Sequence, residues 1–187
     1  ATMNLDEKMQ IAQLLEEMQV DIIEAGFPIA SNGDFEAVSE ISKNIKNSTI
    51  AGLARAKLAD IDRAWEAVKH AKSPRIHTFI ATSPIHMKYK LMKTEEEVLD
   101  SIKHTVTHAR NLCDNIEWSC EDGGRSELEF LYQCIELAIK SGASTINIPD
   151  TVGYSIPEEF AKTIKSIKNN VPNIDKAIIS AHCHNDL

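Results

Sequence analysis

The sequence predicts an α/β fold, a (β/α)8 TIM barrel of which about helix 1 through strand 7 is present. Three observations favour this fold. Segments with helical periodicity alternate with short β-branched or apolar runs, the pattern of a parallel sheet covered by helices. Strand starts recur about every 30 residues, which accommodates one strand, one helix and two short loops. Unusual polar residues follow the strands repeatedly, where barrels carry their chemistry.

An open doubly wound sheet is the alternative architecture that this alternation allows. A dinucleotide-binding sheet of that kind carries a GxGxxG turn after its first strand, and this sequence has none. The barrel is therefore the favoured prediction.

The expected elements begin with a helix over residues 4 to about 18, where Asn4 and Glu7 are spaced as a capping pair. The same spacing marks three later helix starts, and Pro157 suits the first turn of the last of them. These pairs are Thr94 and Glu97, Ser126 and Glu129, and Ser155 and Glu158. Six strands are expected between the helices, at residues 20–25, 49–54, 75–81, 116–120, 144–148 and 177–181.

The strand count predicts an incomplete barrel. A complete one has eight strands and typically spans about 250 residues, whereas this chain has 187. We expect residues 1–187 to form a partial catalytic barrel domain that lacks strand 1 and the end of the barrel. The unpaired strand edges predict association or poor solubility unless chains complement one another.

Composition excludes several classes of protein. The hydrophobic content of 43% is enough for a core, and the formal net charge of −8 argues against nucleic-acid binding. No apolar stretch approaches the roughly 20 residues that cross a bilayer. The four cysteines form no CxxC pair, which indicates reduced thiols. We expect a cytoplasmic protein that binds neither membranes nor nucleic acids.

The strongest local signal is the HxHND segment, residues 182–186, which closes the last expected strand. Residues two apart on a strand share a face, so His182 and His184 could bind one divalent ion. Two half-buried loop histidines are the alternative. Mn²⁺ or Mg²⁺ would need further oxygen ligands, and Zn²⁺ is possible; Asn185 and Asp186 more plausibly cap a helix or bond within the loop.

Other strand ends carry further candidates. Ser119 and Glu121 share a strand face, and Glu121 could act as a general acid or base or could instead pair with Arg125. Thr151 could offer its hydroxyl to a substrate carboxylate, although it is an ordinary loop residue. His77 lies within a strand, where a lone histidine is usually structural. Glu24 also ends a strand and could face the barrel mouth or bridge to a loop.

Taken together, the strand-end segments resemble the α-isopropylmalate synthases, within the larger family of metal-dependent TIM-barrel condensing and cleaving enzymes. The HxHND segment is shared across that larger family, including homocitrate and citramalate synthases. The resemblance runs along essentially the whole chain and is carried by residues 24–28, 33–36, 75–83, 119–122, 147–154, 172–176 and 182–186.

This resemblance implies an acyltransferase that condenses acetyl-CoA, as co-substrate, with the 2-oxoacid 3-methyl-2-oxobutanoate in leucine biosynthesis. It implies that His182 and His184 bind the metal, that His77, Ser119 and Thr151 contact substrate, and that Glu121 is catalytic. The family's Arg-Asp pair of strand 1, an asparagine ligand and a C-terminal regulatory region are missing from the sequence. The implied complete protein is a homo-oligomer, and the chain alone is expected to be inactive. A sister synthase, or a non-catalytic barrel module, is the alternative.

Overall fold

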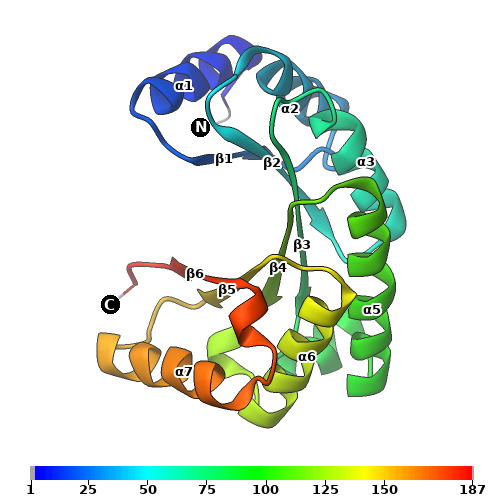
Figure 1. Ribbon diagram of the computed structural model, residues 1–187, viewed down its shortest axis with the longest axis vertical. Coiled ribbons are helices and arrows are strands. Elements are labelled where there is room, and N and C mark those ends of the chain that lie inside the picture. The colour runs from blue at the N-terminus through cyan, green and yellow to red at the C-terminus, as the bar shows by residue number, and fades with distance from the viewer. Residues whose placement is uncertain (1–2, 187) are drawn as a thin grey trace.

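The centre of the molecule is a six-stranded parallel sheet whose strand order follows the chain. The computed structural model describes residues 3–186. The sheet curls into a half-barrel that is open on one side, with helices on its convex face (Figure 1). The six strand predictions are confirmed, with ends within two residues. The strands are β1 (Ile22–Gly26), β2 (Thr49–Arg55), β3 (Pro74–Ala81), β4 (Ile116–Glu121), β5 (Thr145–Asp150) and β6 (Ile178–Cys183).

Helices connect successive strands, as a parallel sheet requires. Short π and 3-10 turns, labelled η, lie in the loops. The α-helices are α1 (Leu5–Glu17), α2 (Asn32–Asn44), α3 (Leu58–Val68), α4 (Pro84–His86), α5 (Glu95–Leu112), α6 (Leu128–Ser141) and α7 (Pro157–Asn170). The turns are η1 (Met87–Leu91), η2 (Gly123–Arg125) and η3 (Ile174–Lys176).

Two of the predicted helix caps are confirmed and two are wrong. Both reciprocal hydrogen bonds form in the boxes of Asn4 with Glu7 and of Thr94 with Glu97, and Pro157 opens α7.

The box expected at Ser126 does not form, because its hydroxyl bonds to Oγ1 of Thr82 at 2.7 Å and α6 starts one residue beyond Glu127. The box expected at Ser155 also fails. Its backbone N–H donates to Oδ2 of Asp150 at 3.0 Å, and Ile156 is the N-cap of α7. In both places a contact with a strand-end loop replaces the local cap.

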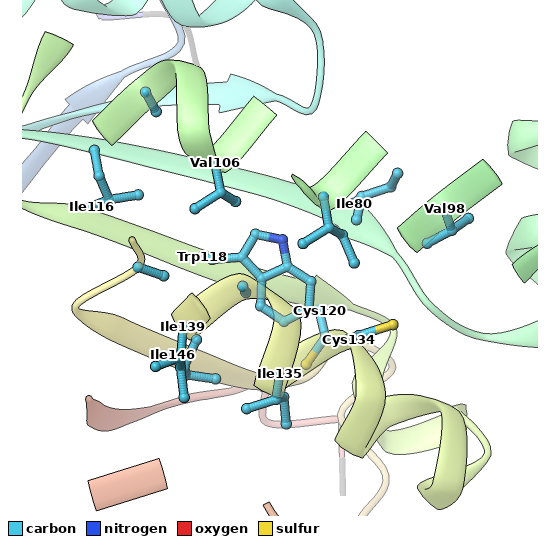
Figure 2. Packing of buried hydrophobic residues seen from close by; sticks show 14 of the residues in the cluster. Ile80, Val98, Val106, Ile116, Trp118, Cys120, Cys134, Ile135, Ile139 and Ile146 are labelled. Carbon is cyan, nitrogen blue, oxygen red and sulfur yellow. The ribbon is translucent and has the colours of Figure 1, made fainter. Parts of the chain in front are cut away.

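The convex face of the sheet buries the main hydrophobic core. Trp118 of β4 is fully buried, and Figure 2 shows it among Ile80, Val106, Cys134 and Ile135. Outward positions of the strands alternate with inward ones, so every second strand residue meets the helices. Truncation of a buried aromatic residue of this size costs about 3–5 kcal/mol, which makes this packing a major part of the stability.

The concave face is polar by contrast. At its deep end Nη1 of Arg75 lies 2.7 Å from Oε2 of Glu117, and both side chains are largely buried. The register pairs Phe79 with Ser119 and Ser119 with Asn147, so that these residues occupy one layer across three strands. Polar side chains thus continue from the deep end toward the carboxyl ends of the strands.

The half-barrel leaves apolar surface at its two edges. β1 and β6 are the edge strands, and Ile178 on β6 is 67% exposed. On α1, beside the opposite edge, Leu14 and Met18 are exposed. Six strands and these open edges confirm the prediction of an incomplete barrel. Within residues 3–186, no helix combines the length and the apolar character needed to cross a membrane.

Candidate active site at the carboxyl ends of the strands

A cleft of about 220 Å³ opens on the concave face at the carboxyl ends of the strands. The six residues proposed from the sequence all line it, although they come from three strands, β3, β4 and β6, and from the loops after β5 and β6. Five further residues complete its wall. The cleft is lined by Glu24, Leu53, His77, Phe79, Ser119, Glu121, Asn147, Pro149, Thr151, His182 and His184.

The two histidines at the end of β6 turn their rings toward each other. Nε2 of His182 lies 3.1 Å from Nε2 of His184, and the ring centroids are 4.9 Å apart. Period-two alternation places both residues on the cleft side of the chain. When both Nε2 atoms lack a proton, the two rings can offer nitrogen lone pairs to one ion bound beside them.

This separation fits a divalent cation. With metal–nitrogen bonds of about 2.0–2.1 Å, two adjacent ligands lie about 2.8–3.0 Å apart on an octahedral ion and about 3.3–3.4 Å apart on a tetrahedral one, so the full range is about 2.8–3.4 Å. The observed 3.1 Å is within that range. Among residues 3–186, no group of three or more His, Cys, Asp or Glu side chains is placed to hold an ion. His182 and His184 therefore fit as part of a ligand set.

His77 is the centre of a hydrogen-bond chain that crosses the cleft floor. Its Nδ1 contacts Oε2 of Glu24, and its Nε2 lies 2.6 Å from Oγ of Ser119. Nδ2 of Asn147 donates to the same Oγ at 2.8 Å. The carboxylate of Glu24 favours a proton on Nδ1 of His77, which leaves Nε2 to accept from Ser119. His77 is therefore held in one orientation, and Glu24 bridges to it across the sheet.

Glu121 points into the cleft from the end of β4 and is paired with Lys90 of η1. Nδ1 of His86 lies 3.8 Å from Oε1 of Glu121. The alternative pairing with Arg125 is wrong, because Nε of Arg125 bonds to Oδ1 of Asp122 at 2.7 Å. Asp122 is buried and captures the guanidinium, which leaves Glu121 facing the cleft.

Thr151 lies in the loop after β5, and its hydroxyl has a fixed acceptor role. The backbone N–H of Asp122 donates to Oγ1 of Thr151 at 2.9 Å. The hydroxyl proton of Thr151 therefore remains available to donate to a ligand in the cleft.

Sequence reasoning missed Leu53, Phe79, Asn147 and Pro149 as cleft residues, and it missed Lys90 as the partner of Glu121. Strand parity could have found the first four, because every second residue before a strand end shares the inward face. Lys90 had no comparable signal. It reaches Glu121 from 31 residues away through the π-helical turn.

Cys120 lies beneath the cleft on the helix side of β4. Burial raises the pKa of its thiol to about 12, so the thiol stays protonated at neutral pH. Cys183, between the two histidines, is exposed.

The half-barrel and its polar cleft place the chain in the class of (β/α)8-barrel proteins, which carry their sites at this end of the strands. Comparison with known proteins narrows the class. The chain belongs to the HMGL-like family, whose family model matches residues 1–187.

Curated relatives with the name 2-isopropylmalate synthase match the whole chain. The proteins from Rhodopseudomonas palustris and Caulobacter vibrioides are 61% and 60% identical to it over 187 residues. One from Ruminiclostridium cellulolyticum is 60% identical over 185 residues, or 99% of the chain. The chain spans 36% of the length of each of these relatives.

Solved structures show the same fold at low sequence identity. The HMG-CoA lyase of Bacillus subtilis superposes with a TM-score of 0.74 at 20% identity, covering 98% of this chain and 63% of that one. The HMG-CoA lyase of Brucella melitensis gives a TM-score of 0.75 at 18% identity, covering 98% and 66%. The predicted barrel architecture is thereby confirmed.

Proposed function

We propose that the protein containing this chain is a 2-isopropylmalate synthase. It would condense acetyl-CoA with 3-methyl-2-oxobutanoate and release 2-isopropylmalate and CoA. The observation that carries this proposal is the convergence of His182 and His184 in the same cleft as His77, Ser119 and Thr151. The relatives that are 57–61% identical along the chain support it through their name.

The proposed metal site uses His182 and His184 together with ligands outside residues 3–186. Mn²⁺ or Mg²⁺ is the proposed ion, and imidazole nitrogen also suits Zn²⁺. A divalent ion, when bound, would supply a Lewis acid that polarises the ketone of the 2-oxoacid.

The proposed substrate contacts come from the cleft floor. Thr151 has a hydroxyl proton to donate to the substrate carboxylate, and Ser119 and His77 line the same cleft. Glu121 is the proposed acid–base residue. Its carboxylate lines the cleft and is held by Lys90, within reach of a substrate bound there.

The apolar part of the cleft favours a branched 2-oxoacid. Leu53, Phe79 and Pro149 line the same space as the polar groups. A second carboxylate, as in 2-oxoglutarate, would lose hydration against these side chains without a compensating charge. Pyruvate would leave the apolar space unfilled, and each missing methylene in such a pocket costs about 1–3 kcal/mol. This supports 3-methyl-2-oxobutanoate over the substrates of homocitrate and citramalate synthases.

The proposed synthase function also implies a domain organisation. Residues 1–187 would form part of a catalytic barrel, and the remaining strands and a regulatory region would belong to the rest of the protein. The chain's share of its relatives, 36% of their length, leaves room for both.

The direct test is an assay of the complete protein with acetyl-CoA and each of three 2-oxoacids. CoA release would be measured with 3-methyl-2-oxobutanoate, 2-oxoglutarate and pyruvate in the presence of Mn²⁺ or Mg²⁺. Preference for the first supports the proposal. Preference for either of the others would assign a sister synthase, and no turnover with any of them would reject a condensing function.

The metal assignment has its own test. Replacing His182 with Ala should lower Mn²⁺ affinity by at least about 100-fold, because loss of an outer-shell partner alone costs about 10–100-fold. His104 on α5 is exposed and does not line the cleft, so His104→Ala is the matched control. Equal Mn²⁺ affinity of the two variants, measured by calorimetry, would remove His182 from the ligand set.

A further inference from the structure

The side chain of Asp122 joins two strand-end loops through a buried carboxylate. It is 1% exposed, its Oδ2 accepts the hydroxyl hydrogen bond of Ser83, and its Oδ1 accepts from Nε of Arg125 at 2.7 Å. Ser83 belongs to the loop after β3, whereas Asp122 and Arg125 belong to the loop after β4. Both carboxylate oxygens are therefore engaged.

The backbone of Asp122 adds a third loop. Its N–H donates to Oγ1 of Thr151, in the loop after β5, at 2.9 Å. The N–H and the carboxylate can serve different loops because Asp122 has a φ of 61°, in the left-handed region that Asp and Asn tolerate better than most residues. A non-glycine residue holds this conformation only where its surroundings enforce it.

The residues around Asp122 are closely packed. A Cβ added at Gly123, the next residue, would lie 2.8 Å from Sγ of Cys120. Ser83 is completely buried and also receives the backbone N–H of His86, at 3.4 Å. The close packing at Gly123 and the contact with buried Ser83 therefore both restrict the loop after β4.

We propose that Asp122 is a positioning residue that holds the loops after β3, β4 and β5 in one arrangement and thereby sets Glu121 and Thr151 in the cleft. Glu121 is its immediate chain neighbour, and Thr151 is its direct hydrogen-bond partner. Asp122 is absent from the cleft wall, so it acts through those residues and not on the substrate. This role rests on the proposed synthase function only for its effect on turnover.

The test uses Asp122→Asn in the complete protein. Asn keeps the size and the tolerance of positive φ but removes the charge that binds Arg125. We expect kcat to fall at least about ten-fold, since a displacement of about 1 Å in a catalytic group can cost about 100-fold. Mn²⁺ affinity should change by less than about three-fold, because the two proposed histidine ligands lie on β6 and directly after it, outside the three loops that Asp122 joins. Hydrogen exchange should accelerate in residues 83–87 and 151–155 and stay unchanged in β2 and β3.

Asp114→Asn is the matched control, because Asp114 is also paired with an arginine, Arg110 at 3.0 Å, but its side chain is 97% exposed. It should leave kcat and exchange unchanged. Ser83→Ala removes one of the two hydrogen bonds to the carboxylate of Asp122 and should lower kcat by a smaller factor than Asp122→Asn. This second variant can still test the proposal if Asp122→Asn fails to fold.

Two results would overturn the positioning role. One is a kcat within two-fold of the parent in both Asp122→Asn and Ser83→Ala. The other is a parallel loss of Mn²⁺ affinity and of exchange protection throughout the sheet, which would indicate a general structural role. If the parent protein has no synthase turnover, the proposed function fails separately. Exchange in residues 83–87 and 151–155 then decides the positioning role, and unchanged exchange rejects it.

Discussion

Nε2 of His77 lies 2.6 Å from Oγ of Ser119, although 42 residues separate the two along the chain. The parallel register of β3 and β4 brings them together, since Phe79 pairs with Ser119 and His77 stands two residues earlier. The contact joins adjacent strands at the floor of the cleft. It is therefore the natural point at which to test substrate binding.

Replacing Ser119 with Ala should weaken binding of the 2-oxoacid. Ser119 donates its hydroxyl proton to His77 and accepts from Asn147, so its loss releases two side chains of the cleft floor. A hydrogen bond of this kind is worth about 0.5–1.5 kcal/mol, so KM for 3-methyl-2-oxobutanoate should rise about two-fold to ten-fold. Steady-state kinetics of the complete protein measure this. Thr163→Ala, an exposed hydroxyl on α7, is the control. An unchanged KM would exclude Ser119 from the substrate contacts.

Glu121→Gln should reduce turnover more than it affects binding. Loss of a general acid or base typically costs about 10²–10⁴-fold in rate, and Gln keeps the shape of the side chain. The measurement is kcat beside KM in the complete protein. Glu127→Gln, at an exposed position six residues later, should have no effect. A kcat equal to that of the parent would show that Glu121 has no part in proton transfer.

The cysteines should differ sharply in reactivity. Cys183 is exposed, whereas Cys113, Cys120 and Cys134 are buried. Burial raises the pKa of all three buried thiols, that of Cys120 to about 12, and the thiolate is the reactive form. A thiol reagent at pH 7 should label one cysteine rapidly in the folded chain and all four in denaturant. Rapid labelling of two or more in the folded chain would contradict the burial of the core.

The contact between α1 and α2 should weaken in acid. Hydrogen bonds from Ser31 and Lys8 lower the pKa of Asp34 below its ordinary value of 3.8. A lowered folded-state pKa gives a contribution that is present above 3.8 and is lost as the pH falls through the folded value. The free energy of unfolding of Asp34→Asn should therefore fall less steeply than that of the parent below pH 3.8. The free energy of unfolding of both proteins would be measured by denaturant titration at each pH. Equal slopes against pH would refute this prediction. Because Asp34 is partly exposed, the effect should be small.

The histidines of the cleft show how much of the site could be predicted. His182 and His184 needed only strand periodicity, because side chains two apart on an extended chain share a face wherever the strand lies. His77 could be placed on a strand but not given a partner. Its contact with Glu24 spans 53 residues and depends on how the sheet curls.

The failed caps illustrate the opposite case. Ser126 and Ser155 have the local spacing of a capping box, as Asn4 and Thr94 do. They differ because each lies beside a strand-end loop, where Thr82 and Asp150 compete for the same groups. Thr82 is 44 residues from Ser126, so the local pattern cannot report it. Asp150 is only five residues from Ser155, but it meets the Ser155 N–H only because the loop after β5 turns back on itself.

The sequence by itself determined the order of strands and helices, the barrel class and the polar strand ends, because these depend on short-range periodicity. Tertiary structure alone decided which polar groups meet. It paired Arg125 with Asp122 and Lys90 with Glu121, and it left Glu121 facing the cleft. The physical reason is that hydrogen bonds and ion pairs act over a few ångströms, and only the register and curl of the sheet bring residues from separate loops within that range.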